Sequence, residues 1–399
     1  MIKKANAIKI IVILFLSAMA FVFYQYNRTD PIISLGVSTD GRYVISAHAS
    51  RDAHPFYPKG QLVLWDIEKK EKKILADDVN AYSANFIPDS HEFIWQDAQS
   101  VVHIQNVDGQ ELEKFNHFWV IGHLMSANKD FYLSANKYGH LYKGYNENMV
   151  PIYTDGGTGA PLTLSMSENY FLSISNSGLP DNKPVAETDL TANPINPYDS
   201  KNGSYDGMTL WDRHTLKPVA RLWGNVGKTT GLLSPDGNWV VTGGENHRNF
   251  MWEVHNLSNR QWLAQVEDGI YREDTETYDK SQLLPIPDKF KNKQITQISV
   301  IAIAFVTDTE FVMLRQSGNK DGFGDELAAL YTVGDPWIKG YVEIGNDPSI
   351  STNYYQRNLS VSSSPKAHIL VTGQATGGGI NVYKYHPDKM ELEKIWVAD

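Results

Sequence analysis

Cysteine is absent from this chain of 399 residues. Its absence excludes disulfide bonds, thiolate metal ligands, covalently attached haem, cysteine nucleophiles and the lipidated cysteine of a lipoprotein. A chain without thiols is also compatible with an oxidising compartment.

Positive charge is scarce as well. The 36 Lys and Arg residues stand against 46 Asp and Glu residues, which gives a formal net charge of −10. A nucleic-acid interface needs a positive patch to neutralise phosphates. We therefore predict that nucleic acid is not a partner.

The N-terminus carries a long apolar run. Lys3, Lys4 and Lys9 precede an uncharged stretch at residues 10–26 that is mostly Ile, Val, Leu, Phe and Ala. A basic flank followed by such a stretch is typical of an export signal or a membrane anchor, and the flank stays in the cytoplasm. We predict that residues 1–30 are a signal anchor or signal peptide with a short linker, built on one hydrophobic helix.

Two fates of this segment stay open. An uncleaved helix would make the protein single-pass in a bacterial inner membrane, with the remainder in the periplasm. Ala18-Met19-Ala20 fits the small-x-small rule of signal peptidase, so cleavage near Ala20 would instead give a soluble periplasmic or secreted protein.

Residues 31–399 repeat one pattern seven times, at spacings of about forty to seventy residues. Each repeat has a short polar turn, an apolar strand, a loop and a second strand that often ends in Trp. The clearest turns are Ser-Thr-Asp-Gly at 38–41, Ile-Pro-Asp-Ser at 87–90 and Ser-Pro-Asp-Gly at 234–237. The pattern predicts an all-β domain, a seven-bladed β-propeller, with six or eight blades as alternatives.

Period-two alternation and short apolar runs predict the strands of the first three blades. They are 33–38, 43–47, 62–67 and 72–76; 82–87, 92–96, 101–106 and 111–115; 119–125, 131–135, 140–144 and 150–154. Blade four begins near Pro161 and resumes at 208–213, and the last three blades span 229–265, 297–345 and 358–397. Because the first blade starts on an innermost strand and the last ends on an outermost one, we expect the ring to close by packing of blade seven against blade one.

Three predicted third strands end in Trp and an acid, at Trp65-Asp66, Trp211-Asp212 and Trp252-Glu253. With the Pro-Asp-Gly turns, these steps resemble the WD40-type and related bacterial seven-bladed propellers over about residues 31–399. Blades two, three, six and seven lack the Trp-Asp pair, and no blade has the full Gly-His…Asp…Trp-Asp network. The resemblance implies a degenerate member and an architecture, and it implies no activity.

The predicted connections fall on two faces. Turns from first to second and from third to fourth strand lie on one face, the tight-turn face. Connections from second to third strand and from blade to blade lie on the other, the long-loop face. All the long insertions lie on the long-loop face: residues 49–60, 176–207, 267–293, 315–325 and 374–379. Long loops held on one side of a rigid scaffold favour a binding surface there.

The partner-binding candidates are aromatic and charged residues of these loops. Tyr among short polar residues gives large, adaptable contact areas, and the acidic stretch at 267–279 could steer a basic partner. The candidates are His48, Arg51, Tyr57, Tyr198, Tyr205, Arg248, Tyr271, Glu273, Asp274 and Tyr278.

No catalytic or cofactor site is predicted. Gly224 to Thr229 lacks the first Gly of a phosphate loop, since Leu222 stands there, and no Gly-x-Ser-x-Gly or His-Glu-x-x-His occurs. Asn319, Asp321 and Asp325 are weak calcium candidates, because Ala328 stands where the bidentate acid belongs.

These observations favour an exported, non-catalytic binding or scaffold protein that engages a protein partner in the cell envelope. Two alternatives stay open. One is an inhibitor or immunity-type protein that neutralises a toxin or enzyme. The other, on fold analogy alone, is a propeller enzyme with an axial site, a metal-dependent hydrolase or lactonase or a quinone-dependent dehydrogenase.

Overall fold

The computed structural model describes residues 32–49, 57, 59–137, 140–153, 161–178, 206–222, 226–245, 249–263, 284–285, 297–317, 327–344, 361–373 and 378–398. The predicted N-terminal helix lies outside these residues. Among the described residues, no helix has both the length and the apolar character needed to cross a membrane.

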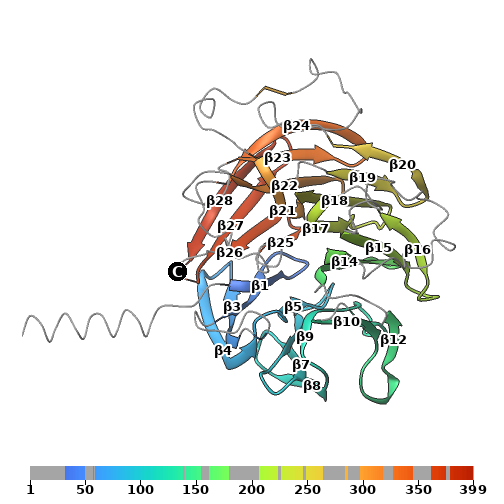
Figure 1. The fold of residues 1–399 in the computed structure, drawn as a ribbon. Helices are drawn as coiled ribbons and strands as arrows, with labels where there is room; N and C mark the ends of the chain where they lie inside the picture. Colours follow the sequence, from blue (N-terminus) through green and yellow to red (C-terminus); the bar gives the residue numbers. More distant parts are fainter. Residues whose placement is uncertain are drawn as a thin grey trace, which may run out of the picture.

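The described strands form seven antiparallel blades of four strands each around one axis (Figure 1), and a single pairing of Glu245 with Ser299 joins blades five and six into one eight-stranded sheet. The first four blades are β1 (Ile32–Val37), β2 (Tyr43–His48), β3 (Lys59–Asp66) and β4 (Glu71–Asn80); β5 (Asn85–Phe86), β6 (Glu92–Gln96), β7 (Val101–Asn106) and β8 (Glu111–Asn116); β9 (Val120–Met125), β10 (Tyr132–Asn136), β11 (Leu141–Lys143) and β12 (Val150–Tyr153); β13 (Pro161–Met166), β14 (Tyr170–Gly178), β15 (Asp206–Asp212) and β16 (Pro218–Leu222).

Blades five to seven are β17 (Val226–Leu233), β18 (Trp239–Glu245), β19 (Phe250–Glu253) and β20 (Asn256–Trp262); β21 (Gln297–Phe305), β22 (Glu310–Ser317), β23 (Leu327–Thr332) and β24 (Asp335–Glu343); β25 (Val361–Ser364), β26 (Ile369–Gly373), β27 (Ile380–His386) and β28 (Glu391–Ala398). Besides strands, the described residues contain one 3-10 turn, η1 (Asn146–Asn148). The seven-bladed all-β prediction is confirmed.

The ring closes without a shared strand. Each terminal blade pairs its own four strands in order, β1 to β4 and β25 to β28, and β1 contacts both β25 and β26. The junction is an apolar layer in which Trp65, fully buried, packs with Val371, Ile380 and Val382 of blade seven. Closure by packing of blade seven on blade one is therefore confirmed.

The Trp-Asp steps have a local explanation. The indole N–H of Trp65 donates to Ser46 Oγ at 2.8 Å, and that of Trp211 donates to Ser173 Oγ at 3.0 Å. Asp66 then accepts the backbone N–H of Lys69 at 3.0 Å, and Asp212 accepts that of Thr215 at 2.7 Å. The Trp thus ties the third strand to the second, and the acid closes the turn to the fourth.

The first strand of blade two is shorter than the predicted 82–87. Asn80 Oδ1 accepts the Tyr82 N–H at 3.1 Å, and Ser83 Oγ donates to the Asn80 carbonyl at 2.7 Å. These side chains bind backbone groups that would otherwise enter the ladder, so β5 begins at Asn85.

The Ser-x-Asp-Gly turns are built alike in blades one and five. Ser38 Oγ donates to Asp40 Oδ1 at 2.7 Å and accepts the Tyr43 N–H at 2.9 Å. Gly41 and Gly237 both have a φ of 72°, in the left-handed region that favours glycine. At Gly41 the turn also meets blade seven, because an added Cβ would lie 2.5 Å from Ala367 Cβ.

We expect Gly41→Ala to destabilise the propeller by about 2–5 kcal/mol. The left-handed φ costs Ala about 1–2 kcal/mol, and the overlap with Ala367 adds about 1–3 kcal/mol. Gly109→Ala is the control, because Gly109 has a φ of 95° but a Cβ added there would lie 3.5 Å from its nearest neighbour, Lys73 Nζ. Urea denaturation measures the free energy of unfolding of both variants. Equal losses of stability would show that the turn at Gly41 is not tightly packed against blade seven.

Candidate functional site

Two of the ten predicted partner-binding residues, His48 and Tyr57, lie in the described part of the chain. The other eight lie outside it: Arg51, Tyr198, Tyr205, Arg248, Tyr271, Glu273, Asp274 and Tyr278. The calcium candidates Asn319, Asp321 and Asp325 also lie outside it.

His48 is not a surface residue. Strand β2 continues through His48, and the side chain is 0% exposed. Its Nε2 lies 2.9 Å from Ser46 Oγ, the same hydroxyl that binds the Trp65 indole. His48 therefore belongs to a buried network that supports Trp65, and this burial does not fit the interpretation of His48 as a contact residue.

Tyr57 is 36% exposed and lies on the long-loop face, between β2 and β3. Lys137, between β10 and β11, donates to the Tyr57 hydroxyl and places its Nζ 4.9 Å from the ring centroid. The ring also meets Trp119 edge to face at 5.4 Å. Tyr57 therefore links the loop of blade one to blade three.

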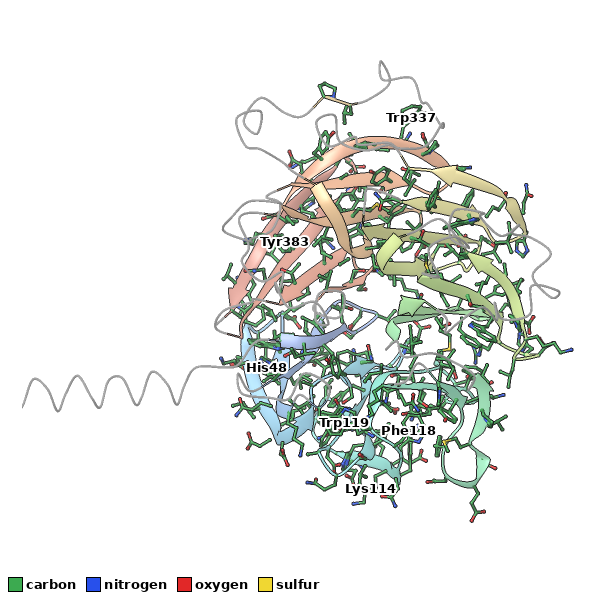
Figure 2. The ribbon with its side chains drawn as sticks, in the orientation of Figure 1. His48, Lys114, Phe118, Trp119, Trp337 and Tyr383 are labelled. Carbon is green, nitrogen blue, oxygen red and sulfur yellow. The ribbon has the colours of Figure 1, made fainter. Side chains whose placement is uncertain are left out.

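Phe118 and Trp119 extend this surface, and neither is among the contact residues predicted from the sequence. They lie in the connection from β8 to β9, on the long-loop face (Figure 2). Phe118 packs against Tyr142 with ring centroids 4.9 Å apart. The signal in the sequence is a pair of adjacent aromatic residues in a blade-to-blade connection, but the alternation pattern includes Trp119 in the strand that follows. We call Tyr57, Phe118, Trp119, Lys137 and Tyr142 the aromatic surface.

A buried amide network holds the aromatic surface from below. Gln96 Nε2 donates to the Phe118 carbonyl at 2.8 Å, and Gln96 Oε1 accepts the Val120 N–H at 3.0 Å. Asn80 Nδ2 donates to the same Gln96 oxygen at 2.8 Å and to the Val120 carbonyl at 2.7 Å. Both amide side chains are fully buried, so the backbone that carries Phe118 and Trp119 is fixed by three hydrogen bonds, and a fourth joins the two amides.

The opposite face carries a pocket of about 490 Å³ between the inner turns of blades one, two and seven. We call it the tight-turn pocket. Its lining residues are Thr39, Asp40, Asp89, Ser90, His91, Lys366 and Ala367. No contact residue is predicted from the sequence on this face.

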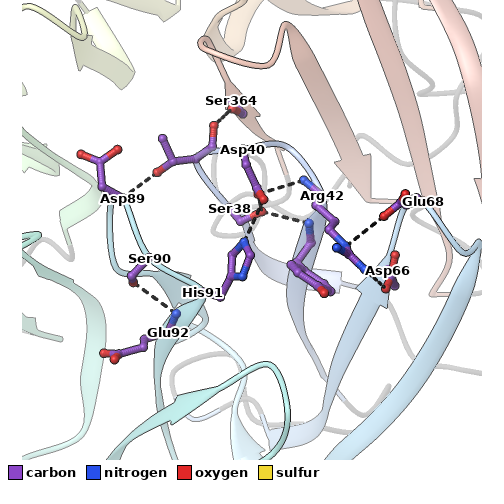
Figure 3. Close-up of polar contacts among 12 residues, drawn as sticks. Ser38, Asp40, Arg42, Asp66, Glu68, Asp89, Ser90, His91, Glu92 and Ser364 are labelled. Atoms are coloured by element: carbon purple, nitrogen blue, oxygen red, sulfur yellow. Dashed lines mark hydrogen bonds and ion pairs between the residues drawn. The ribbon is translucent and has the colours of Figure 1, made fainter.

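Two side-chain contacts between blades line the tight-turn pocket. Asp40 Oδ2 lies 2.8 Å from His91 Nε2 (Figure 3), and Asp89 Oδ1 lies 2.7 Å from Lys366 Nζ. The Asp89 N–H donates to Thr39 Oγ1 at 2.8 Å. The pocket walls are thus connected to one another across three blades.

Asp40 is held as a carboxylate. Burial by itself would raise its pKa, but hydrogen bonds from Ser38, His91 and the Arg42 backbone N–H outweigh that effect, and the pKa lies below its ordinary value. The Asp89 carboxylate raises the pKa of Lys366, mainly through their hydrogen bond. Both charges therefore persist at neutral pH.

The described residues contain no cluster of side chains suited to bind a metal ion. No group of three or more His, Asp or Glu side chains there could hold a metal ion. A phosphate loop would lead into a helix. Here Val226 instead begins the strand β17.

Comparisons with known proteins support the architecture. No protein-family model and no curated protein sequence matches the chain. The chain is similar to the solved structure of KlHsv2 with loop 6CD replaced by a Gly-Ser linker, at 9% identity and a TM-score of 0.52, covering 92% of this chain and 98% of that one. It is also similar to the β-propeller domain of Cps50 (Swd1) from Myceliophteria thermophila, at 11% identity and a TM-score of 0.54, covering 90% and 98%. Identities this low show the fold alone, a seven-bladed β-propeller.

Proposed function

We propose that this protein is a non-catalytic binding or scaffold protein whose long-loop face engages a protein partner. The observation that carries the proposal is the asymmetry of the connections. On the tight-turn face no connection between strands exceeds six residues, whereas residues 179–205, 263–296 and 344–360 all connect strands on the long-loop face. The last of these was not among the predicted insertions, and it strengthens the asymmetry.

The aromatic surface supports the proposal with side chains of the appropriate kind. Aromatic residues contribute large contact areas at low cost in conformational entropy, and they are enriched at protein interfaces. Tyr57 and Lys137 add a hydroxyl and a cation at the edge. The surface therefore combines an apolar centre with polar groups that can select a partner.

The network beneath the aromatic surface also favours binding. Asn80 and Gln96 hold the Phe118 carbonyl and both backbone groups of Val120. A surface that is already ordered loses less conformational entropy when a partner binds.

Export is part of the proposal and rests on the sequence. The basic flank and the apolar run at residues 10–26 favour an anchor in a bacterial inner membrane with the propeller in the periplasm. Cleavage near Ala20 would place the same binding face in the periplasm without an anchor. Intact mass of the purified protein separates the two forms.

Crosslinked affinity purification of the full chain, read by mass spectrometry, tests the partner face. Deletion of residues 267–293 is expected to abolish capture of the partner, and Tyr57→Ala is expected to weaken it about tenfold, as for an interface hot spot. Asp388→Ala is the control, because Asp388 is exposed between β27 and β28 on the tight-turn face. Equal capture by all three variants and the parent chain would refute the assignment of the face.

A further inference from the structure

The walls of the tight-turn pocket offer more hydrogen-bond acceptors than donors. The Asp40 carboxylate can only accept, so His91 Nε2, at 2.8 Å from Asp40 Oδ2, carries the proton between them. In neutral His91 the other nitrogen, Nδ1, is then an acceptor. None of the described residues donates to it.

Asp89 adds a further acceptor. Its Oδ1 accepts from Lys366 Nζ at 2.7 Å, and in the described part of the chain its Oδ2 makes no hydrogen bond. The Ser90 hydroxyl is already used, because it donates to the Ile87 carbonyl at 2.9 Å and accepts the Glu92 N–H at 3.2 Å. The remaining donors of the lining side chains belong to Lys366 and the Thr39 hydroxyl.

The net charge of the pocket also favours a positively charged ligand. Its lining contains two carboxylates, Asp40 and Asp89, against the single ammonium of Lys366, which gives a net charge of −1 with His91 neutral. Asp308, in the inner turn of blade six, acts electrostatically on the same Lys366. The field inside the pocket therefore attracts cations.

The pocket is formed in advance. Gly41 lies so close to Ala367 that no Cβ fits between the two turns, and Ser364 Oγ donates to the Thr39 carbonyl. Lys384 Nζ donates to the Ala367 carbonyl at 2.6 Å. A ligand would not have to order these walls, so little binding free energy is lost.

We infer that the tight-turn pocket binds a cationic nitrogen group, an alkylammonium or a guanidinium, which donates to Asp40, Asp89 and His91 Nδ1. Two sources present this chemistry: a free polyamine, and a Lys or Arg side chain of a second protein. The site lies on the face opposite the aromatic surface, so it is independent of the partner face proposed above.

Isothermal titration of the purified full chain tests the inference with two probes. One is spermidine, and the other is a capped hexapeptide with one central Arg, compared with the same peptide carrying Gln. Each exposed charge contact is worth up to about fivefold in affinity, so Asp40→Asn with Asp89→Asn is expected to weaken binding about tenfold. At position 40, Asn keeps an oxygen that can accept the hydrogen bond from Ser38. At position 89, Asn tolerates the backbone φ of 56°.

Asp236→Asn is the matched control, because Asp236 makes the same turn as Asp40, with Ser234 and Asn238, outside the pocket. Lys366→Met is expected to increase the affinity for both probes, because it releases Asp89 from its ion pair. Binding of spermidine alone would assign a small-molecule ligand, and binding of the Arg peptide alone would assign a protein ligand. The inference is overturned if neither probe binds, or if Asp40→Asn with Asp89→Asn binds as tightly as Asp236→Asn.

Discussion

Removal of residues 385–399 is expected to abolish cooperative unfolding of the propeller. The truncation deletes β28, which pairs with β27 from Ile380↔Ala398 to His386↔Glu391. It also deletes Tyr385, which is fully buried against blade six, and Trp396, which packs on the blade-one layer around Trp65. Blade seven thus loses contacts to both of its neighbours.

The size of this effect follows from the closure of the ring. Loss of one buried aromatic side chain costs about 3–5 kcal/mol, and a whole domain is stable by only about 5–15 kcal/mol. Because β1 belongs to blade one and not to blade seven, none of the described strands can replace the missing pairing of β27. We therefore expect a broad, shallow urea transition in Trp fluorescence and far-UV circular dichroism.

Val397→Thr is the control for the truncation. Val397 lies on the same strand but is 53% exposed, so its substitution should change the free energy of unfolding by less than about 0.5 kcal/mol. A single sharp transition of the truncated chain at the parent midpoint would show that blade seven does not hold the ring closed.

Acid is expected to destabilise the protein strongly between pH 6.5 and pH 4, because two histidines are buried in the neutral form between blades two and three. His123 Nε2 lies 2.9 Å from the Ser83 carbonyl, and its Nδ1 lies 2.9 Å from the Tyr132 hydroxyl. His117 Nε2 lies 2.8 Å from Ser134 Oγ. Burial lowers the pKa of each to about 4.

The direction of the pH dependence follows from these values. An unfolded His has a pKa near 6.5, so below that pH the unfolded chain takes up protons that the folded chain does not. The free energy of unfolding therefore falls as the pH drops from about 6.5 to about 4, and the loss levels off below that. At pH 5 the loss is about 2 kcal/mol for the fully buried His123 and somewhat less for His117.

Urea denaturation at pH 7 and pH 5 measures this loss. His123→Gln keeps a donor for the Ser83 carbonyl but does not titrate, so it should reduce the difference between the two pH values by about 2 kcal/mol. His214→Gln is the control, since His214 is exposed in the turn after β15. An unchanged difference in the His123 variant would show that this histidine does not govern the acid response.

Much of the fold was predictable because its signals are local. The Ser-x-Asp-Gly turn closes within six residues by bonds among Ser38, Asp40 and Tyr43, and the Trp-Asp step closes within five. Alternation then marks which side chains are buried. The structure differs from the sequence-based expectation at His48, which is buried on β2 beside Ser46. It differs also at β5, which begins later because the Asn80 and Ser83 side chains bind backbone groups before it.

The candidate sites were less predictable because their parts are far apart in the chain. Tyr57 and Lys137 are separated by 80 positions, and Asp89 and Lys366 by 277. Neither pair belongs to a motif of fixed spacing, so no pattern in the sequence predicts that they meet.

The sequence by itself determined the repeat, the all-β class and the face on which the long connections lie. These properties depend on the turn chemistry within each blade and on the antiparallel order of its strands, which reverses direction at every connection. The tertiary structure alone decided that the inner turns of blades one, two and seven enclose a pocket, and that the rings of Tyr57 and Trp119 meet. The physical reason is ring closure: packing of apolar layers between blades brings distant turns together, and their polar side chains pair only after that packing has formed.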